Sequence, residues 1–142
     1  MLLAPRHPAA IGAILALAIP GAVVAASPAS AATSCYGSSC TGLDPSSTTC
    51  ADDARTVEVG GGTGEIQLRY SPSCRAAWAR LQWSRGSGYI KVDNDNGDAY
   101  KATVTGSGKT NVFTLMVNDK DITSNAQYFW DGGRQWDSTP RY

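Results

Sequence analysis

The sequence predicts an all-β fold, a small antiparallel barrel or sandwich with two disulfides and an irregular N-terminal arm. Three observations favour this class. Short segments alternate apolar and polar residues, as Ile66, Leu68 and Tyr70 do within residues 65–70, and this period is typical of half-buried strands. Turns rich in Gly and Asn separate these segments, and the sequence has no long amphipathic pattern and no internal repeat. Four cysteines lie between residues 35 and 74.

The first 31 residues are predicted to be a secretory signal peptide. Arg6 and His7 give a weakly basic start, and an uncharged apolar run follows over residues 9–26. Ala29-Ser30-Ala31 then places small residues where a signal peptidase reads them. A retained membrane anchor is the alternative, but Pro20-Gly21 interrupts the run, which is near the lower limit for a span. We expect cleavage after Ala31, secretion to the extracellular space and no membrane segment in the mature chain.

The mature chain is predicted to have two parts. Residues 32–49 are rich in Ser, Thr, Gly and Pro and are expected to form an irregular arm looped by a disulfide. Residues 50–142 have the length of a single small β domain. We expect one helical turn at residues 50–54, and strands at residues 56–59, 65–70, 76–83, 88–93, 99–105, 112–117, 126–130 and 134–136.

The turn around Asn96-Gly97 is expected to join two of these strands in a hairpin. A two-residue loop would place Ile90 opposite Thr103, which mixes apolar and polar positions across the pair. A three-residue loop at residues 96–98 instead pairs Ile90 with Val104 and Val92 with Ala102. Because register follows the hydrophobic pattern, we predict the longer loop with a bulge.

The charge balance excludes several classes of function. Removal of the signal peptide takes away Arg6 and no acid, so 12 − 1 = 11 basic residues face 12 acidic ones. Neither a basic run nor a basic stripe is present, so we expect no nucleic-acid partner and no anionic membrane partner. The only histidine, His7, leaves with the signal peptide, which excludes imidazole catalysis and histidine-containing zinc sites. We therefore expect no enzyme activity and no cofactor.

The four cysteines are predicted to form two disulfides, because an even count in a small exported domain is typical of such bridges. Their spacing lacks the paired short knuckles of a four-cysteine zinc site, which is the alternative. A hairpin folded about Gly62 pairs positions whose numbers sum to about 124, and Cys50 and Cys74 meet this condition. We therefore predict the bridge Cys50–Cys74, which leaves Cys35–Cys40 to close a short loop in the arm.

Three stretches carry a family resemblance: CYGSSCTGLDP from residue 35, CADDART from residue 50 and LRYSPSCRAAWAR from residue 68. Over residues 34–82 the chain resembles the YjfA-like family of secreted bacterial domains of unknown function. The resemblance implies secretion, disulfide bonds and a compact domain. It supplies no activity and no catalytic residue.

Aromatic residues gather near the end of the chain, and exported sugar-binding domains stack such rings on pyranoses. Nearby acids and arginines could bind the hydroxyl groups. Alternation places Tyr128 and Trp130 on the same side of a strand, pointing outward if Phe129 points inward. The alternative is that these rings fill the core of a small β domain. The candidate ligand-binding residues are Tyr128, Trp130, Asp131, Arg134 and Trp136.

Two further clusters have alternative interpretations. Asp93, Asp95 and Asp98 offer oxygen ligands in a calcium-like loop, but Asn, Asp and Gly also satisfy the geometry of an ordinary hairpin turn. We expect no metal unless calcium binds there. The second cluster contains Arg69, Tyr70, Trp78 and Arg80. Stacking of arginine on aromatic rings would be structural, or it would form part of a recognition surface.

These features favour a non-catalytic, secreted binding or interaction domain, whose extracellular ligand is an envelope component, a glycan or a protein. The alternative is a secreted inhibitor of a protease or another enzyme, with a rigid binding loop at residues 106–111 or at Ser71-Pro72-Ser73. A carboxylate-based hydrolase is a third hypothesis. It would need two acids that converge in a concave pocket.

Overall fold

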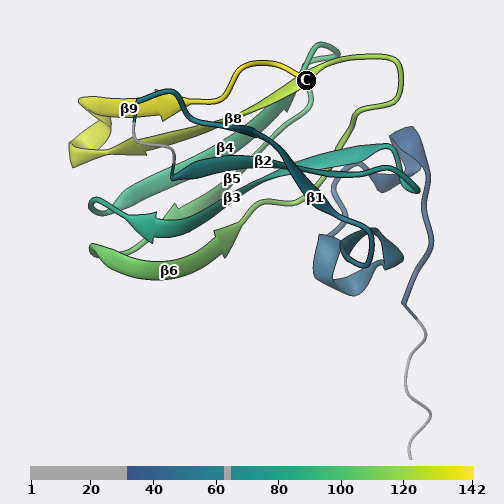
Figure 1. Cartoon of the computed structure of the whole chain (residues 1–142), viewed down its shortest axis with the longest axis horizontal. Coiled ribbons are helices and arrows are strands. Elements are labelled where there is room, and N and C mark those ends of the chain that lie inside the picture. The colour runs from purple at the N-terminus through teal and green to yellow at the C-terminus, as the bar shows by residue number, and fades with distance from the viewer. Residues whose placement is uncertain (1–31, 63–64) are drawn as a thin grey trace, which may run out of the picture. The chain divides into compact units, whose positions relative to one another are not determined.

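Two antiparallel sheets pack against each other in the computed structural model, which describes residues 32–62 and 65–142 (Figure 1). The first sheet has the order β1-β2-β3-β6, with β7 also paired to β3, and the second has the order β5-β4-β8-β9. The strands are β1 Arg55–Val59, β2 Ile66–Ser71, β3 Ala76–Ser84, β4 Gly88–Asn94, β5 Ala99–Val104, β6 Gly108–Phe113, β7 Val117–Asn118, β8 Ser124–Trp130 and β9 Gln135–Ser138. The predicted all-β class is confirmed, and its form is a sandwich.

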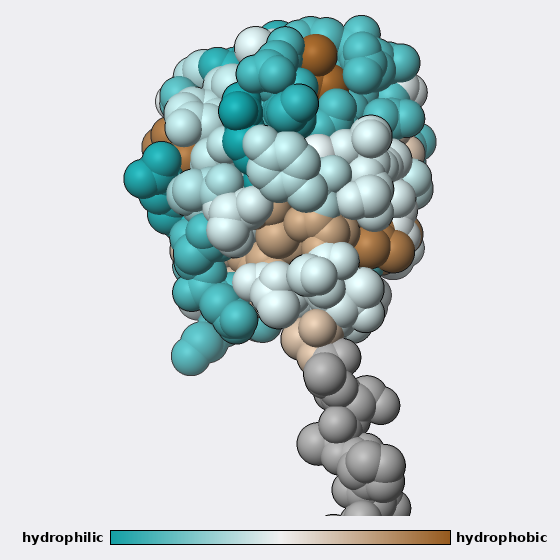
Figure 2. Space-filling view, turned by 90° about the vertical axis from the view of Figure 1, so that its right-hand side faces the viewer, coloured by the Kyte–Doolittle hydropathy of each residue, from teal (hydrophilic) through white to brown (hydrophobic). Residues whose placement is uncertain are grey.

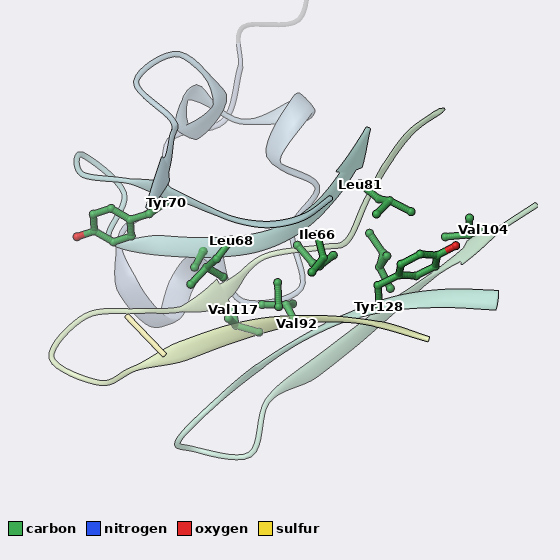
Figure 3. Close-up of a cluster of buried hydrophobic side chains, with 12 residues drawn as sticks. Ile66, Leu68, Tyr70, Leu81, Val92, Val104, Val117 and Tyr128 are labelled. Atoms are coloured by element: carbon green, nitrogen blue, oxygen red, sulfur yellow. The ribbon is translucent and has the colours of Figure 1, made fainter. Parts of the chain in front are cut away.

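An aliphatic core fills the space between the two sheets (Figure 3). It is built by alternation, because every second residue of a strand points to the same face. In β2 these residues are Ile66, Leu68 and Tyr70, and in β4 they are Ile90 and Val92, all buried. Ala77, Ala79 and Leu81 of β3 also face this core. The alternate residues of β2 and β3 therefore lie on the opposite, outer face of the first sheet.

The N-terminal arm covers part of that outer face. It contains three short 3₁₀ helices, η1 Gly37–Cys40, η2 Pro45–Ser47 and η3 Thr49–Ala51. Backbone hydrogen bonds attach the arm to the strands, from Gly37 N to Cys74 O at 2.7 Å and from Gly42 N to Met116 O at 2.9 Å. A second apolar cluster beneath the arm contains Cys40, Cys50, Cys74, Ala76, Trp78 and Met116. The arm and the sandwich belong to one compact unit.

Both predicted disulfides are present, Cys35–Cys40 and Cys50–Cys74. The two bridges touch, since Sγ of Cys35 lies 3.4 Å from Sγ of Cys50. The β1–β2 hairpin beside them pairs Arg55 with Tyr70, so its register sums to 125 or 126 and not to 124. The bulge between Thr56 and Glu58 lowers the sum from 126 near the turn to 125 at the open end, which reduces the shift. The disulfide prediction tolerates it because the cysteines lie beyond the ends of both strands.

The predicted strand at residues 112–117 is wrong, because β6 ends at Phe113 and β7 begins only at Val117. Between them the backbone leaves β3 to bind the arm, with Met116 N donating to Leu43 O at 2.9 Å. Thr114 stays attached to β3 through its own N–H, which donates to Ala79 O. The interruption follows from contact with a segment about 70 residues earlier in the chain, which a local pattern does not contain.

The predicted register of the β4–β5 hairpin is also wrong. Ile90 lies opposite Ala102 and Val92 opposite Tyr100, so the loop consists of residues 95–97. The Asn94 side chain sets this loop, because its Oδ1 accepts from the N–H groups of Asn96 and Asp98. Gly97 has a φ of 88°, which glycine adopts without a steric penalty. A slip by two residues keeps every side chain on its face, so alternation alone does not distinguish the two registers.

The predicted signal peptide, residues 1–31, lies outside the described residues. Within residues 32–62 and 65–142, no helix has the length and apolar character needed to cross a membrane.

Candidate functional site

A groove of about 200 Å³ lies where the arm only partly covers the outer face of the first sheet. One wall comes from the strands, with Arg69, Trp78, Arg80 and Phe113. The other comes from the arm, which contributes Pro45, and from Ala54 just before β1. Figure 2 shows the side that carries the arm, where a band of hydrophobic residues interrupts a largely hydrophilic surface.

The register of β2 and β3 brings two arginines onto this outer face. Arg69 pairs with Trp78 and Gln67 pairs with Arg80, so the two arginines lie diagonally across the strand pair. Each arginine alternates with core residues of its own strand, which fixes the direction of its side chain.

Hydrogen bonds hold both guanidinium groups in place. Arg69 donates through Nη1 to Thr56 Oγ1 at 2.9 Å and through Nη2 to the Ala54 carbonyl at 2.8 Å. Arg80 donates through Nε and Nη2 to Oε1 of Gln67, at 3.0 and 2.7 Å. A guanidinium has five N–H donors. Both side chains are therefore oriented by the protein and keep donors that these bonds do not use.

Neither arginine has a carboxylate partner among the ion pairs of the described residues. Burial lowers the pKa of both guanidinium groups, and the positive charge of Arg80 lowers the pKa of Arg69 further. Arginine still stays charged at such pKa values. The groove therefore concentrates two positive charges that the surrounding protein does not neutralise.

The chemistry of the groove suits an anion attached to an apolar group. Oriented guanidinium donors match the oxygens of a carboxylate, a sulfate or a phosphate. Trp78 and Phe113 supply aromatic surface beside them. The cation–π contacts of the described residues involve Lys101 with Tyr89 and Lys120 with Tyr36. Within the described residues, neither Arg69 nor Arg80 stacks on an aromatic ring.

Tyr128 and Trp130 share one face of β8, but this is the inner face. Tyr128 is fully buried in the aliphatic core, and Trp130 packs against that core. The Tyr128 hydroxyl donates to the carbonyl of Gly86 and lies 2.9 Å from Ser84 Oγ. The outward orientation considered for these two residues is therefore wrong, and the core alternative is the one observed.

The other predicted C-terminal residues lie on the surface. Trp136 is 63% exposed, and Asp131 pairs with Arg134 at 3.8 Å. The rings of Phe129 and Trp136 are nearly parallel, with centroids 6.5 Å apart, and Tyr89 stacks on Phe129 at 4.8 Å. These rings form a row across strands β4, β8 and β9, in which Trp136 stays largely exposed. They do not form a flat platform with Tyr128.

The carboxylates considered for calcium contact cationic groups and an amide. Asp93 lies 3.3 Å from Lys91 and 3.2 Å from Arg141, and Asp95 lies 2.7 Å from Arg141. Asp98 accepts from the Asn94 side chain at 3.0 Å. These contacts suit a hairpin turn secured by Arg141, and calcium binding at Asp93, Asp95 and Asp98 stays a prediction.

The loops considered for an inhibitor also have definite positions. Most of residues 106–111 belong to strand β6, which pairs with β3. Ser71-Pro72-Ser73 is held by Asp53, which accepts from the Ser71 hydroxyl and from the Ser73 N–H, the latter at 2.8 Å. The Ser71 hydroxyl also accepts from Cys74 N, and this bond closes a short turn beside that cysteine.

The sequence pattern grouped Arg69, Trp78 and Arg80, but it did not place Asn111 and Phe113 beside them. Both lie on β6, which reaches the groove only because β6 pairs with β3. The cluster was also expected to include Tyr70. This residue points the opposite way, because it follows Arg69 directly on a strand.

The sequence profile of one family, described as a protein of unknown function (DUF2690), matches residues 38–127. The match covers more than half of the chain and includes the strand residues of the groove. It extends past residues 34–82, the part that carries the YjfA-like resemblance, and that name stays a prediction. No curated protein matches the chain. No solved structure matches it either. The chain therefore belongs to the DUF2690 family of proteins of unknown function.

Proposed function

We propose that this protein is a secreted, non-catalytic binding domain, and that its groove takes an anionic group of an extracellular ligand. The observation that carries the proposal is the pair Arg69 and Arg80, two oriented guanidinium groups without a carboxylate partner among the described residues. Placing like charges close together is unfavourable. An incoming anion would offset this cost and use the remaining N–H donors.

The shape of the groove supports a particular kind of group. A volume of about 200 Å³ suits a side chain or a terminal group of a larger molecule, since whole small-molecule pockets are usually larger. Trp78 and Phe113 provide an apolar surface next to the charges. A carboxylate borne on a flat apolar body would satisfy both features at once.

The extracellular location and the lack of catalysis rest on separate observations. Two disulfides are typical of exported domains, and the predicted signal peptide would direct export. After its removal the chain would have no histidine, and the groove offers arginines, aromatic rings and amides, which bind but are poor general bases at neutral pH.

The test is a titration of the purified protein with 3-phenylpropionate, followed by NMR of the arginine Nε–H and tryptophan indole signals. We expect saturable shifts for Arg69, Arg80 and Trp78, with weaker binding as salt rises because the interaction is ionic. Inorganic phosphate, titrated in parallel, separates the need for charge from the need for an apolar body.

Arg80→Gln should weaken binding at least about tenfold, which is the effect of losing one charged hydrogen bond. The matched control is Arg134→Gln, because Arg134 is exposed and far along the chain from the groove. Shifts that do not saturate, or equal binding by Arg80→Gln and the parent protein, would refute the proposal.

A further inference from the structure

A second cavity, of about 260 Å³, shares no lining residue with the groove. It lies beside the segment that follows β7, and its walls include Tyr70, Arg75, Asp119, Asp121 and Tyr142. Backbone hydrogen bonds hold Tyr142 in this position, since Tyr142 N donates to Ser124 O at 3.0 Å and Ser124 N to Tyr142 O at 3.1 Å.

Three buried polar atoms near this cavity lack hydrogen bonds within the described residues. They are Oδ1 of Asp119, Nε of Arg75 and Oγ of Ser124. Asp119 is only 5% exposed and Ser124 is fully buried. Buried polar atoms in native proteins are almost always paired. A carboxylate oxygen and a guanidinium N–H that are both unpaired, beside one cavity, indicate a partner that supplies a donor and an acceptor together.

The protonation state of Asp119 supports this interpretation. Burial raises its pKa to about 6. The Ser124 hydroxyl, which is close enough to act on the carboxylate but does not meet hydrogen-bond geometry, and the charge of Arg75 lower this pKa in part. At neutral pH the carboxylate is therefore mostly ionised and accepts hydrogen bonds only. Asp121 is already engaged, with its Oδ1 3.1 Å from Nη2 of Arg75.

The charges around the cavity favour a neutral ligand. Asp119 feels the positive charges of Arg75 and Arg141 and the negative charge of Asp95. A bound cation would therefore be repelled by the arginines, and a bound anion would be repelled by the aspartates. Hydroxyl groups donate and accept at once. Two adjacent hydroxyls can donate to Asp119 and accept from Arg75, which a purely apolar or singly charged group cannot do.

Aromatic rings form the remaining wall. The Tyr70 and Tyr142 rings have centroids 5.2 Å apart at 60°, and Tyr142 is 41% exposed. Such a ring can pack against the C–H face of a sugar while polar groups bind its hydroxyls. We propose that this cavity binds a neutral saccharide, through adjacent hydroxyls held by Asp119 and Arg75 and a ring face packed on Tyr142. With Asp121 paired to Arg75, one free carboxylate remains, which suits binding and not two-carboxylate hydrolysis.

The test is saturation-transfer NMR of the purified protein with glucose, galactose and N-acetylglucosamine at millimolar concentration, and with acetamide as an amide probe. We expect transfer to the ring protons of at least one sugar. Asp119→Asn and Tyr142→Ala should each weaken that binding about tenfold or more. Thermal unfolding of both variants checks that the fold is kept.

Trp136→Ala is the matched control, because it removes an exposed aromatic ring elsewhere and should leave sugar binding unchanged. Loss of binding in Trp136→Ala, with none in Tyr142→Ala, would move the site to the outer face of the second sheet and overturn the proposal. The absence of transfer to every sugar would also overturn it, leaving a cavity that holds water only. So would transfer to acetamide alone.

Discussion

The two faces of the first sheet are covered in different ways. The inner face meets the second sheet, and its residues Leu68, Ala79 and Leu81 are fully buried. The outer face meets the arm, whose cover is partial and depends on two touching disulfides. On the inner face every second residue of both strands is apolar, whereas on the outer face Trp78 is followed by Arg80, and Arg69 lies beside them.

This difference links the stability of the fold mainly to the inner face and the proposed ligand binding to the outer face. A sheet packed on a sheet excludes water along its whole length, so the inner face contributes most of the hydrophobic free energy. The arm is irregular, so it does not cover the outer face of the first sheet along the whole length of the strands. The part of that face that stays uncovered forms the groove. The two disulfides restrict the arm and so add stability on the face that no second sheet covers.

The largest expected effect is on the inner face. Leu81→Ala should lower the free energy of unfolding by about 4 kcal/mol, because it removes a fully buried side chain and leaves a cavity between the sheets. Urea unfolding measured by tryptophan fluorescence checks this. If the loss were under about 1 kcal/mol, the range for surface positions, the inner face would not dominate stability as the comparison requires.

The next effect concerns the disulfides that hold the arm. Replacing Cys50 and Cys74 by Ala should cost about 3.5 kcal/mol, whereas replacing Cys35 and Cys40 should cost about 2 kcal/mol, since the longer loop restricts the unfolded chain more. Urea unfolding of the two double variants measures the difference. An equal loss in both would mean that contacts under the arm, and not loop length, set the contribution of each bridge.

The next effect, smaller than that of the Cys50–Cys74 bridge, comes from the charge of Asp119. This carboxylate is buried, whereas the arginines of the groove are only partly buried. Its folded pKa is raised to about 6 from 3.8 by burial, so the folded state binds the proton more tightly. This contribution to stability is full below pH 3.8 and is lost as the pH rises through 6. Asp119→Asn should therefore exceed the parent in stability at pH 7, by up to about 3 kcal/mol, and match it near pH 4.

Unfolding midpoints of both proteins from pH 4 to pH 8 provide the measurement. A difference that does not change with pH would show that Asp119 has an ordinary pKa in the folded protein. The charges of Arg75, Arg141 and Asp95 also act on the Asp119 carboxylate. Asp119→Asn leaves these three residues unchanged, so the difference between the two proteins reports on Asp119 alone.

Much of the fold could be predicted from local patterns, and the errors have a common cause. Alternation correctly assigned the faces of Ile66, Leu68 and Tyr70. It missed the register of the β4–β5 hairpin, because a slip by two residues keeps each face and the Asn94 side chain decides between the registers. It missed the break after Phe113, because the arm competes for the backbone there.

The candidate site could be predicted only in part. The motif around Arg69, Trp78 and Arg80 is visible in the sequence, but the lack of a carboxylate partner is a property of three-dimensional neighbours. Tyr128 and Trp130 were assigned to one face correctly, yet periodicity does not say which face is inside. The unpaired Asp119 had no sequence signal at all, since an aspartate in a polar turn is ordinary.

By itself the sequence determined the all-β class, the two disulfide pairings and the sharing of faces within each strand. These depend on period, spacing and cysteine number, which are local or nearly local properties. Tertiary structure alone decided which face is buried, where the arm interrupts a strand, and which charges lack partners. Those outcomes depend on contacts between segments far apart in the chain, and on burial, which changes the free energy of a charge only once the surrounding elements have assembled.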